Sequence, residues 1–267
     1  MIKINKTKTA AVLCALIMGA SAIAPSFGFA VGTETQSSQS TETEAGKKSD
    51  GSDSSAEKEQ PKTDSQGRPI LGSGETGILI ESSTGQVLFE SDSSKRMYPA
   101  STTKVMTALI AVEAVAAGEV SMDEQIEITP QMLEGLDPDG SNMALKEGEI
   151  ISFENLLKGL MIPSGNDAAL AIAYRLSQSS DAFAQRMNDR AQQLGLNDTH
   201  FANPHGLHDE NHYTTAADMA KIAREAMKHD TFRNIVDIAH IKIPPTNKTE
   251  KERYYINTNG LLSTMRY

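Results

Sequence analysis

The sequence contains a single cysteine, Cys14, among 267 residues. With one thiol the chain forms neither an internal disulfide framework nor a zinc site built from cysteines. Basic residues are also scarce, because 25 lysines and arginines face 35 aspartates and glutamates. The net charge of −10 repels a phosphate backbone, which argues against nucleic acid as a partner. Any chemistry must therefore rely on oxygen and nitrogen groups.

Long apolar runs are missing except near the amino terminus. Three lysines precede a mostly apolar stretch at residues 10–24, and small residues suitable for cleavage follow at 28–30. The stretch is too short to span a bilayer comfortably, and Pro25 breaks it. Residues 1–30 are therefore predicted to be a signal peptide, with a retained amphipathic or membrane helix as the alternative. We expect the protein to be exported and to act outside the cytoplasm, in the cell envelope or secreted.

The composition changes again after the predicted signal. Residues 31–69 are rich in serine and threonine and nearly free of aliphatic side chains. Such a segment cannot offset its ordering entropy by burial, so it is predicted to be a disordered linker. Residues 70–267 have the length and composition of one folded domain.

The folded part begins with two short apolar runs, 77–81 and 86–89, whose separation by a glycine turn predicts a β-hairpin. Apolar residues then recur at helical spacing after Ser101. A serine at a helix start is explained most simply as a cap. However, Lys104 follows three residues later, which places its amine above Ser101 on the same helix face.

This spacing has a chemical use. A serine hydroxyl is a weak nucleophile until a neighbouring base removes its proton. The Lys104 amine can serve as that base if burial or nearby positive charge lowers its pKa from about 10.4. The backbone N–H of Ser101, near the helix N-terminus, is placed to stabilise an oxyanion. By itself the Ser-x-x-Lys pattern is common, so its interpretation depends on what accompanies it.

A second motif stands between two predicted helical stretches. The apolar run 156–163 ends at Ser164, followed by Gly165 and Asn166, and another helical pattern continues to Leu176. Ser164 is again open to interpretation as a simple cap. A hydroxyl beside a side-chain amide on such a loop is also suited to relaying a proton and orienting a peptide bond.

Together, in this order, the two motifs resemble those of the low-molecular-mass D-alanyl-D-alanine carboxypeptidases, which are penicillin-binding serine peptidases. The resemblance extends from Gly77 to the last residue. The segments that carry it are residues 99–104, 159–169, 199–207, 212–220 and 257–262.

The resemblance implies an α/β fold of the α+β type, the serine β-lactamase or DD-peptidase-like transpeptidase fold, with helices around an antiparallel sheet. It implies Ser101 as nucleophile, Lys104 as general base, Ser164 as proton relay and Asn166 as a contact to the substrate amide. The implied substrate is a peptidoglycan stem peptide ending in D-Ala-D-Ala. β-Lactams are expected to inhibit by trapping Ser101, and no cofactor or metal is required.

The family's third motif, Lys-Thr-Gly, is expected after residues 257–259 and does not occur there. The segment 248–250 reads Lys-Thr-Glu, precedes that point and places a negative charge where a substrate carboxylate should approach. We therefore expect residues 70–267 to be the N-terminal part of the catalytic domain, with a sheet incomplete at the C-terminus and little activity in isolation. Peripheral membrane association is expected to depend on a C-terminal region that this sequence lacks.

Three other functions are alternatives for a chain with these motifs. A class A-like β-lactamase needs a glutamate beyond the second motif, yet none occurs between Asn166 and Glu210. An endopeptidase that cleaves cross-links would use the same residues as a carboxypeptidase. A non-catalytic envelope-binding module is favoured by the missing third motif.

A metal site is the alternative from a different class. The residues that suggest it are His200, His205, His208, Asp209 and His212. Imidazole and carboxylate groups suit zinc, but these spacings span a loop with proline and glycine rather than one helix face. The resemblance favours a polar loop without metal.

Overall fold

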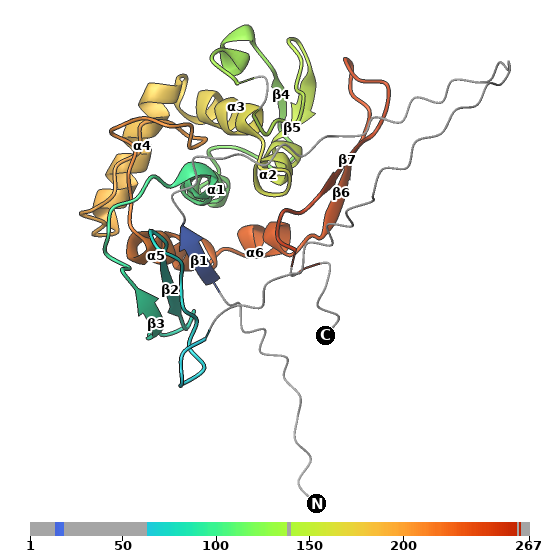
Figure 1. Cartoon of the computed structure of the whole chain (residues 1–267). Helices are drawn as coiled ribbons and strands as arrows, with labels where there is room; N and C mark the ends of the chain where they lie inside the picture. The colour runs from blue at the N-terminus through green and yellow to red at the C-terminus, as the bar shows by residue number, and fades with distance from the viewer. Residues whose placement is uncertain (1–13, 19–62, 138–139, 261, 263–267) are drawn as a thin grey trace, which may run out of the picture. The chain divides into compact units, whose positions relative to one another are not determined.

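The computed structural model describes residues 14–18, 63–137, 140–260 and 262 (Figure 1). Among the described residues, strand residues 14–18 and those from Leu71 onward belong to one larger unit, and residues 63–70 belong to a separate one. The strands are β1 (Cys14–Met18), β2 (Thr76–Ile80), β3 (Val87–Ser91), β4 (Gln125–Glu127), β5 (Ile150–Ser152), β6 (His240–Ile243) and β7 (Arg253–Ile256). The helices are α1 (Lys104–Ala116), α2 (Phe153–Met161), α3 (Asn166–Ser177), α4 (Ser180–Gln193), α5 (Ala216–Ala226) and α6 (Asp230–Val236), with 3₁₀ turns η1 (Ala100–Thr103) and η2 (Pro130–Leu133).

The predicted hairpin is confirmed as the antiparallel pair β2–β3. Strand β1 pairs antiparallel with the other edge of β2, which gives the sheet order β1-β2-β3. Residues 14–18 are the described part of the predicted signal peptide, and they form a strand rather than a helix. Export remains a prediction. Across the described residues, no helix has both the length and the apolar character that a membrane crossing requires.

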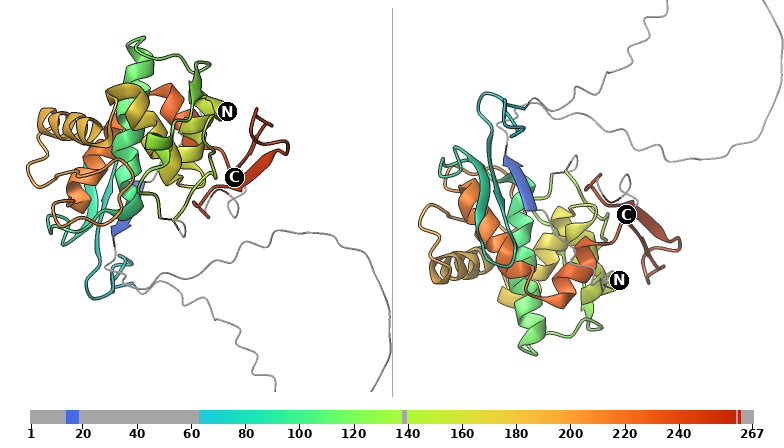
Figure 2. Two further views of the ribbon diagram at one scale, coloured as in Figure 1. Left: turned by 90° about the horizontal axis from the view of Figure 1, so that it is seen from above. Right: turned by 90° about the horizontal axis from the view of Figure 1, so that it is seen from below.

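Helix α1 is the central element of the larger unit (Figure 1, Figure 2). It contacts α2, α3, α4, α5 and α6. Its sequence explains this position, because apolar side chains surround the helix and a helix that is hydrophobic all round must be buried. The buried apolar residues of α1 are Met106, Ala108, Leu109, Ile110, Ala111, Val112 and Ala114.

The remaining sheets are the antiparallel pairs β4–β5 and β6–β7. Helix α5 packs on β1 and β2, where Ile78 and Ile80 meet Ala216 and Ala220 in a small apolar cluster. Helices α2, α4 and α5 begin at side-chain caps, as serine and threonine before a helix predict. The capping residues are Ser152, Ser179 and Thr215.

The end of the predicted linker has local structure. The Asp64 carboxylate accepts hydrogen bonds from the backbone N–H groups of Gln66 (2.8 Å) and Arg68 (2.9 Å). Ordered structure is therefore present ahead of Ile70, the predicted start of the folded part. Residues 31–62 lie outside the described residues.

Candidate active site

Ser101 lies in the 3₁₀ turn η1, which leads directly into α1. Its side chain is exposed and caps neither helix, since Pro99 is the N-cap of η1 and Thr103 that of α1, without side-chain capping bonds. Ala100, directly before it, has φ of +47°, in the left-handed region that residues other than glycine rarely adopt. The capping interpretation of Ser101 is therefore wrong, and a strained turn presents its hydroxyl to solvent.

The amine of Lys104 lies beside this hydroxyl, as the helical spacing predicted. Its Nζ is 3.2 Å from Ser101 Oγ and donates a 2.9 Å hydrogen bond to the carbonyl oxygen of His205. Lys104 is 2% exposed, and this burial lowers its pKa from 10.5 to about 8, while the charge of Asp167 acts in the opposite direction. A neutral amine is thus accessible near neutral pH.

The loop 203–207 provides the carbonyl that holds Lys104. The Asn203 side chain accepts a 2.7 Å bond from the Gly206 N–H and donates a 2.9 Å bond to the Leu207 carbonyl. Gly206 has φ of +90°, and a Cβ there would lie 1.9 Å from the carbonyl oxygen of Ala100. Only glycine allows the loop to approach the Ser101 turn this closely.

A second contact joins the same turn to a buried histidine. His212 Nε2 lies 2.8 Å from Thr103 Oγ1, and its Nδ1 accepts a 3.1 Å bond from the Ala202 N–H. Because Nδ1 is the acceptor, Nε2 carries the proton and donates to Thr103. Burial lowers the pKa of His212 to about 4, which keeps the ring neutral.

The histidines proposed as metal ligands do not form a metal site. His205 Nδ1 accepts from the Leu207 N–H at 3.1 Å, and the His208 ring packs edge-on against Tyr98. In the described part of the chain, no three histidine, cysteine, aspartate or glutamate side chains gather as a metal ion requires. Their positions contradict the metal alternative.

The second motif occupies the connection between α2 and α3. Ser164 has φ of +63° and is half-buried, and the N-cap of α3 is Gly165 rather than this serine. Asn166 is 5% exposed, and its N–H donates to the Ser141 carbonyl at 2.7 Å. The Ser141 hydroxyl in turn donates to the Pro163 carbonyl. Ser164 is therefore not a cap, and its turn is fastened to the segment that begins at residue 140.

Asp167 is a buried residue of the site that the sequence analysis missed. It is 1% exposed and accepts backbone hydrogen bonds from Met143 (2.8 Å), Leu145 (3.0 Å) and Ala168 (2.8 Å). Ala144, between Met143 and Leu145, has φ of +57°, and the N–H groups of both neighbours point toward the carboxylate. Burial raises the pKa of Asp167, and the backbone bonds oppose that rise. The sequence offered one signal for Asp167, because an acidic residue in the first turn of a helix is stabilised by the helix dipole.

The structure thus brings Ser101 and Lys104 into direct contact. Ser164 and Asn166 stand at the start of α3, which packs against α1. Among the described residues no hydrogen bond joins either of them to Ser101 or Lys104, and the electrostatic interaction of Asp167 with Lys104 connects the two motifs. The first motif is thus held by the loop 203–207 and the second by the segment that begins at residue 140.

Residues 64–267 match the model of the D-alanyl-D-alanine carboxypeptidase family. The chain belongs to this peptidase family. The resemblance inferred from the two motifs is confirmed.

Two relatives show the extent of the similarity. The D-alanyl-D-alanine carboxypeptidase DacF of Bacillus subtilis (strain 168) is 36% identical over 187 residues, covering 70% of this chain and 47% of that protein. The D-alanyl-D-alanine carboxypeptidase of Streptomyces sp. (strain K15) is 33% identical over 198 residues, covering 70% of this chain and 67% of that protein. The chain thus spans about half the length of the Bacillus subtilis relative.

Solved structures of the family share the fold. Penicillin binding protein 5 from Haemophilus influenzae matches with a TM-score of 0.65 and 32% identity, over 70% of this chain and 53% of that one. A variant of the Streptomyces K15 DD-transpeptidase matches with a TM-score of 0.66 and 32% identity, over 71% of this chain and 75% of that one. The predicted DD-peptidase-like fold class is confirmed.

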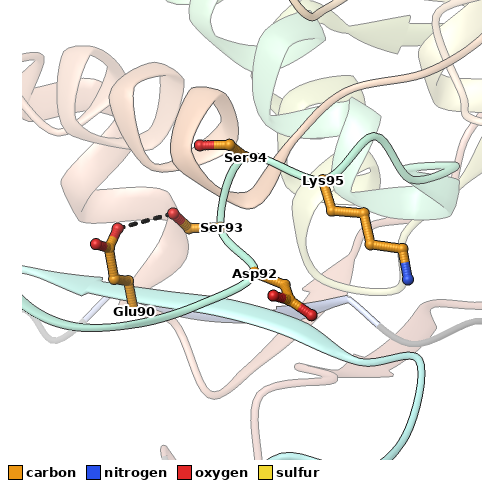
Figure 3. Close-up of a pocket in the computed structure, with 5 residues that line it drawn as sticks. All are labelled: Glu90, Asp92, Ser93, Ser94 and Lys95. Atoms are coloured by element: carbon orange, nitrogen blue, oxygen red, sulfur yellow. Dashed lines mark hydrogen bonds between the residues drawn. The ribbon is translucent and has the colours of Figure 1, made fainter.

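A pocket in the surface of the protein is lined by residues outside both motifs. Its lining consists of Glu90, Asp92, Ser93, Ser94 and Lys95, with Ser93 donating a 2.9 Å bond to Glu90 (Figure 3). None of the predicted site residues lines it. The Ser101 turn therefore remains the candidate catalytic centre.

Proposed function

We propose that this protein is a serine-type D-Ala-D-Ala carboxypeptidase that removes the terminal D-alanine from peptidoglycan stem peptides. The observation that carries the proposal is the buried Lys104 amine, 3.2 Å from the exposed hydroxyl of Ser101 and held by the His205 carbonyl. Membership of the carboxypeptidase family supports the same reaction.

In the first step, neutral Lys104 takes the proton of Ser101 Oγ as this oxygen attacks the carbonyl carbon of the penultimate D-alanine. The Ser101 N–H stabilises the oxyanion. The C–N bond to the terminal D-alanine then breaks, and its nitrogen leaves as an amine after receiving, through Ser164, the proton that Lys104 had taken from Ser101. Asn166 orients the substrate amide during this step.

In the second step, water attacks the ester carbonyl and gives its proton to a base. The base passes this proton to Ser101 Oγ as the C–O bond breaks, which releases the shortened peptide and restores the hydroxyl. A β-lactam follows the first step, because opening of its strained ring acylates Ser101, but the resulting ester hydrolyses slowly. Both steps use side chains and water, so no cofactor enters the proposal.

The substrate implies a location outside the cytoplasm, in the cell envelope or secreted. The names of the relatives as D-alanyl-D-alanine carboxypeptidases support a cell-wall role. The predicted signal at residues 1–30 is consistent with export. Membrane association and the boundaries of signal and linker remain predictions.

The protein expressed from its complete coding sequence provides the test. After incubation with benzylpenicillin, intact mass and peptide mapping should show one adduct on Ser101, and D-alanine should be released from a D-Ala-D-Ala peptide. Ser101→Ala should abolish both, whereas Ser94→Ala, at an exposed serine of the preceding segment, should retain both. An adduct on another residue would exclude Ser101 as nucleophile.

The same experiment separates the alternatives. Rapid loss of the adduct with hydrolysed penicillin would indicate a β-lactamase, and release of monomers from cross-linked peptide without free D-alanine would indicate an endopeptidase. Binding without any adduct or turnover would indicate a non-catalytic module. Each of these results contradicts the carboxypeptidase assignment.

A further inference from the structure

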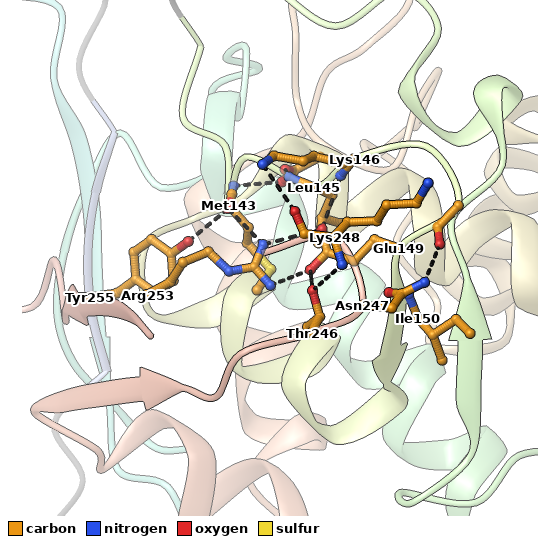
Figure 4. A network of polar contacts seen from close by, with 12 residues as sticks. Met143, Leu145, Lys146, Glu149, Ile150, Thr246, Asn247, Lys248, Arg253 and Tyr255 are labelled. Atoms are coloured by element: carbon orange, nitrogen blue, oxygen red, sulfur yellow. Dashed lines mark hydrogen bonds and ion pairs between the residues drawn. The ribbon is translucent and has the colours of Figure 1, made fainter. Parts of the chain in front are cut away.

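Met143 connects the second motif to the β6–β7 hairpin. Its N–H donates to the Asp167 carboxylate at 2.8 Å, next to Asn166. Its carbonyl oxygen accepts a 2.7 Å bond from the hydroxyl of Tyr255 and a 3.3 Å bond from Arg253 Nη1 (Figure 4). The two sides of one residue are thus bonded to α3 and to β7.

The Met143 side chain is also in contact with the second motif. It is fully buried, and a Cβ added at Gly159 would lie 1.8 Å from its Sδ. A Cβ at Gly165, between Ser164 and Asn166, would lie 3.1 Å from its Cγ. Because the interior is close-packed, a shift of Met143 must be transmitted to the turn 164–166.

The hairpin side of this connection is itself fixed by a buried ion pair. Glu149 is fully buried and pairs with Arg253 Nη2 at 2.5 Å. Its carboxylate also accepts 3.0 Å bonds from the Thr246 hydroxyl and the Lys146 N–H (Figure 4). A buried pair with these additional bonds has one well-defined geometry.

Tyr255 is the member of this network that can be altered most cleanly. Burial raises the pKa of its hydroxyl to about 12, so the group stays protonated and donates to Met143 at physiological pH. Tyr254, its neighbour, is 54% exposed on the opposite face of β7. The two tyrosines therefore form a matched pair for substitution.

We propose that Tyr255 and Arg253 are positioning residues for acyl transfer. By holding the Met143 carbonyl they keep Met143 against the turn 164–166, so that Ser164 and Asn166 meet the substrate in one arrangement. This inference rests on the proposed function. It predicts that the network affects the rate of acylation rather than the binding of substrate.

The test compares Tyr255→Phe with Tyr254→Phe in the complete protein, using a fluorescent penicillin. Tyr255→Phe should lower the first-order acylation rate at saturating penicillin by about fivefold to tenfold, as expected for one hydrogen bond lost from the reactive geometry. The penicillin concentration that gives half the maximal rate should change by less than about twofold, a difference too small to measure reliably. Tyr254→Phe should leave both constants unchanged.

Stoichiometric labelling of Ser101 in each variant separates slower chemistry from a smaller folded fraction. A Tyr255→Phe protein that labels fully and acylates as fast as Tyr254→Phe would overturn the proposal. The proposal would also be overturned if a smaller fraction of Tyr255→Phe protein that labels at Ser101 accounted for its entire loss of acylation. If the wild-type protein itself forms no adduct at Ser101, the proposed function fails instead, which distinguishes the two outcomes.

Discussion

The Nζ of Lys104 donates a hydrogen bond to the carbonyl oxygen of His205, 101 positions further along the chain. In the neutral amine this bond uses one N–H and allows the lone pair to face Ser101 Oγ, 3.2 Å away. The loop 203–207 therefore orients the Lys104 amine, the proposed base. Positioning of a base within hydrogen-bond reach is the first requirement of general base catalysis.

Lys104→Arg tests whether this amine acts as a base. Arginine keeps the positive charge but cannot lose its proton at neutral pH, so acylation by penicillin should fall by at least about 100-fold. Lys228→Arg, at an exposed lysine paired with Glu225, should retain the wild-type rate. A Lys104→Arg rate within a few fold of wild type would limit Lys104 to an electrostatic role.

The pH dependence of acylation should report the lowered pKa of Lys104. Because the reactive form is the neutral amine, the rate should rise with pH and reach half its maximum at about 8, rather than near 10.5. Stopped-flow acylation rates measured across this range provide the curve. A rate independent of pH through this window would contradict general base catalysis by Lys104.

Gly206→Ala should disrupt the approach of the loop to the Ser101 turn. The added Cβ would meet the Ala100 carbonyl at 1.9 Å in a left-handed conformation, so the free energy of unfolding should fall by more than about 4 kcal/mol. Gly195, also left-handed, has open space around the Cβ position, and Gly195→Ala should cost only about 1 to 2 kcal/mol. Urea unfolding of both variants checks this, and equal losses would show that backbone conformation alone matters.

The buried histidines should make the fold sensitive to acid. Burial lowers the pKa values of His205 and His212 from 6.5 to about 4, so between these values the unfolded chain binds more protons than the folded one. Stability should therefore fall as pH decreases from 6.5 to 4, by at most about 3 kcal/mol for each ring. Urea unfolding at several pH values measures this slope. His212→Gln should reduce it and His208→Gln, at an exposed position, should not.

The sequence was sufficient for the features that depend on local geometry. Helical spacing of three residues places Lys104 over Ser101, and two short apolar runs joined by a glycine turn predict β2–β3. The same reasoning could not tell a capping serine from one that lies beside a buried amine. Ser152 caps a helix and Ser101 does not, because Ser101 lies inside a 3₁₀ turn that begins with a left-handed Ala100 and leads directly into α1.

The properties that suit the site to the proposed chemistry were decided by tertiary structure. Burial of Lys104, and with it the fall of its pKa to about 8, requires α1 to be enclosed by other helices and by the loop 203–207. The Asp167 carboxylate likewise accepts two of its hydrogen bonds from the N–H groups of Met143 and Leu145, which lie 24 and 22 positions away in the sequence. Hydropathy and spacing describe one segment at a time, whereas desolvation and long-range hydrogen bonds depend on which segments the folded chain brings together.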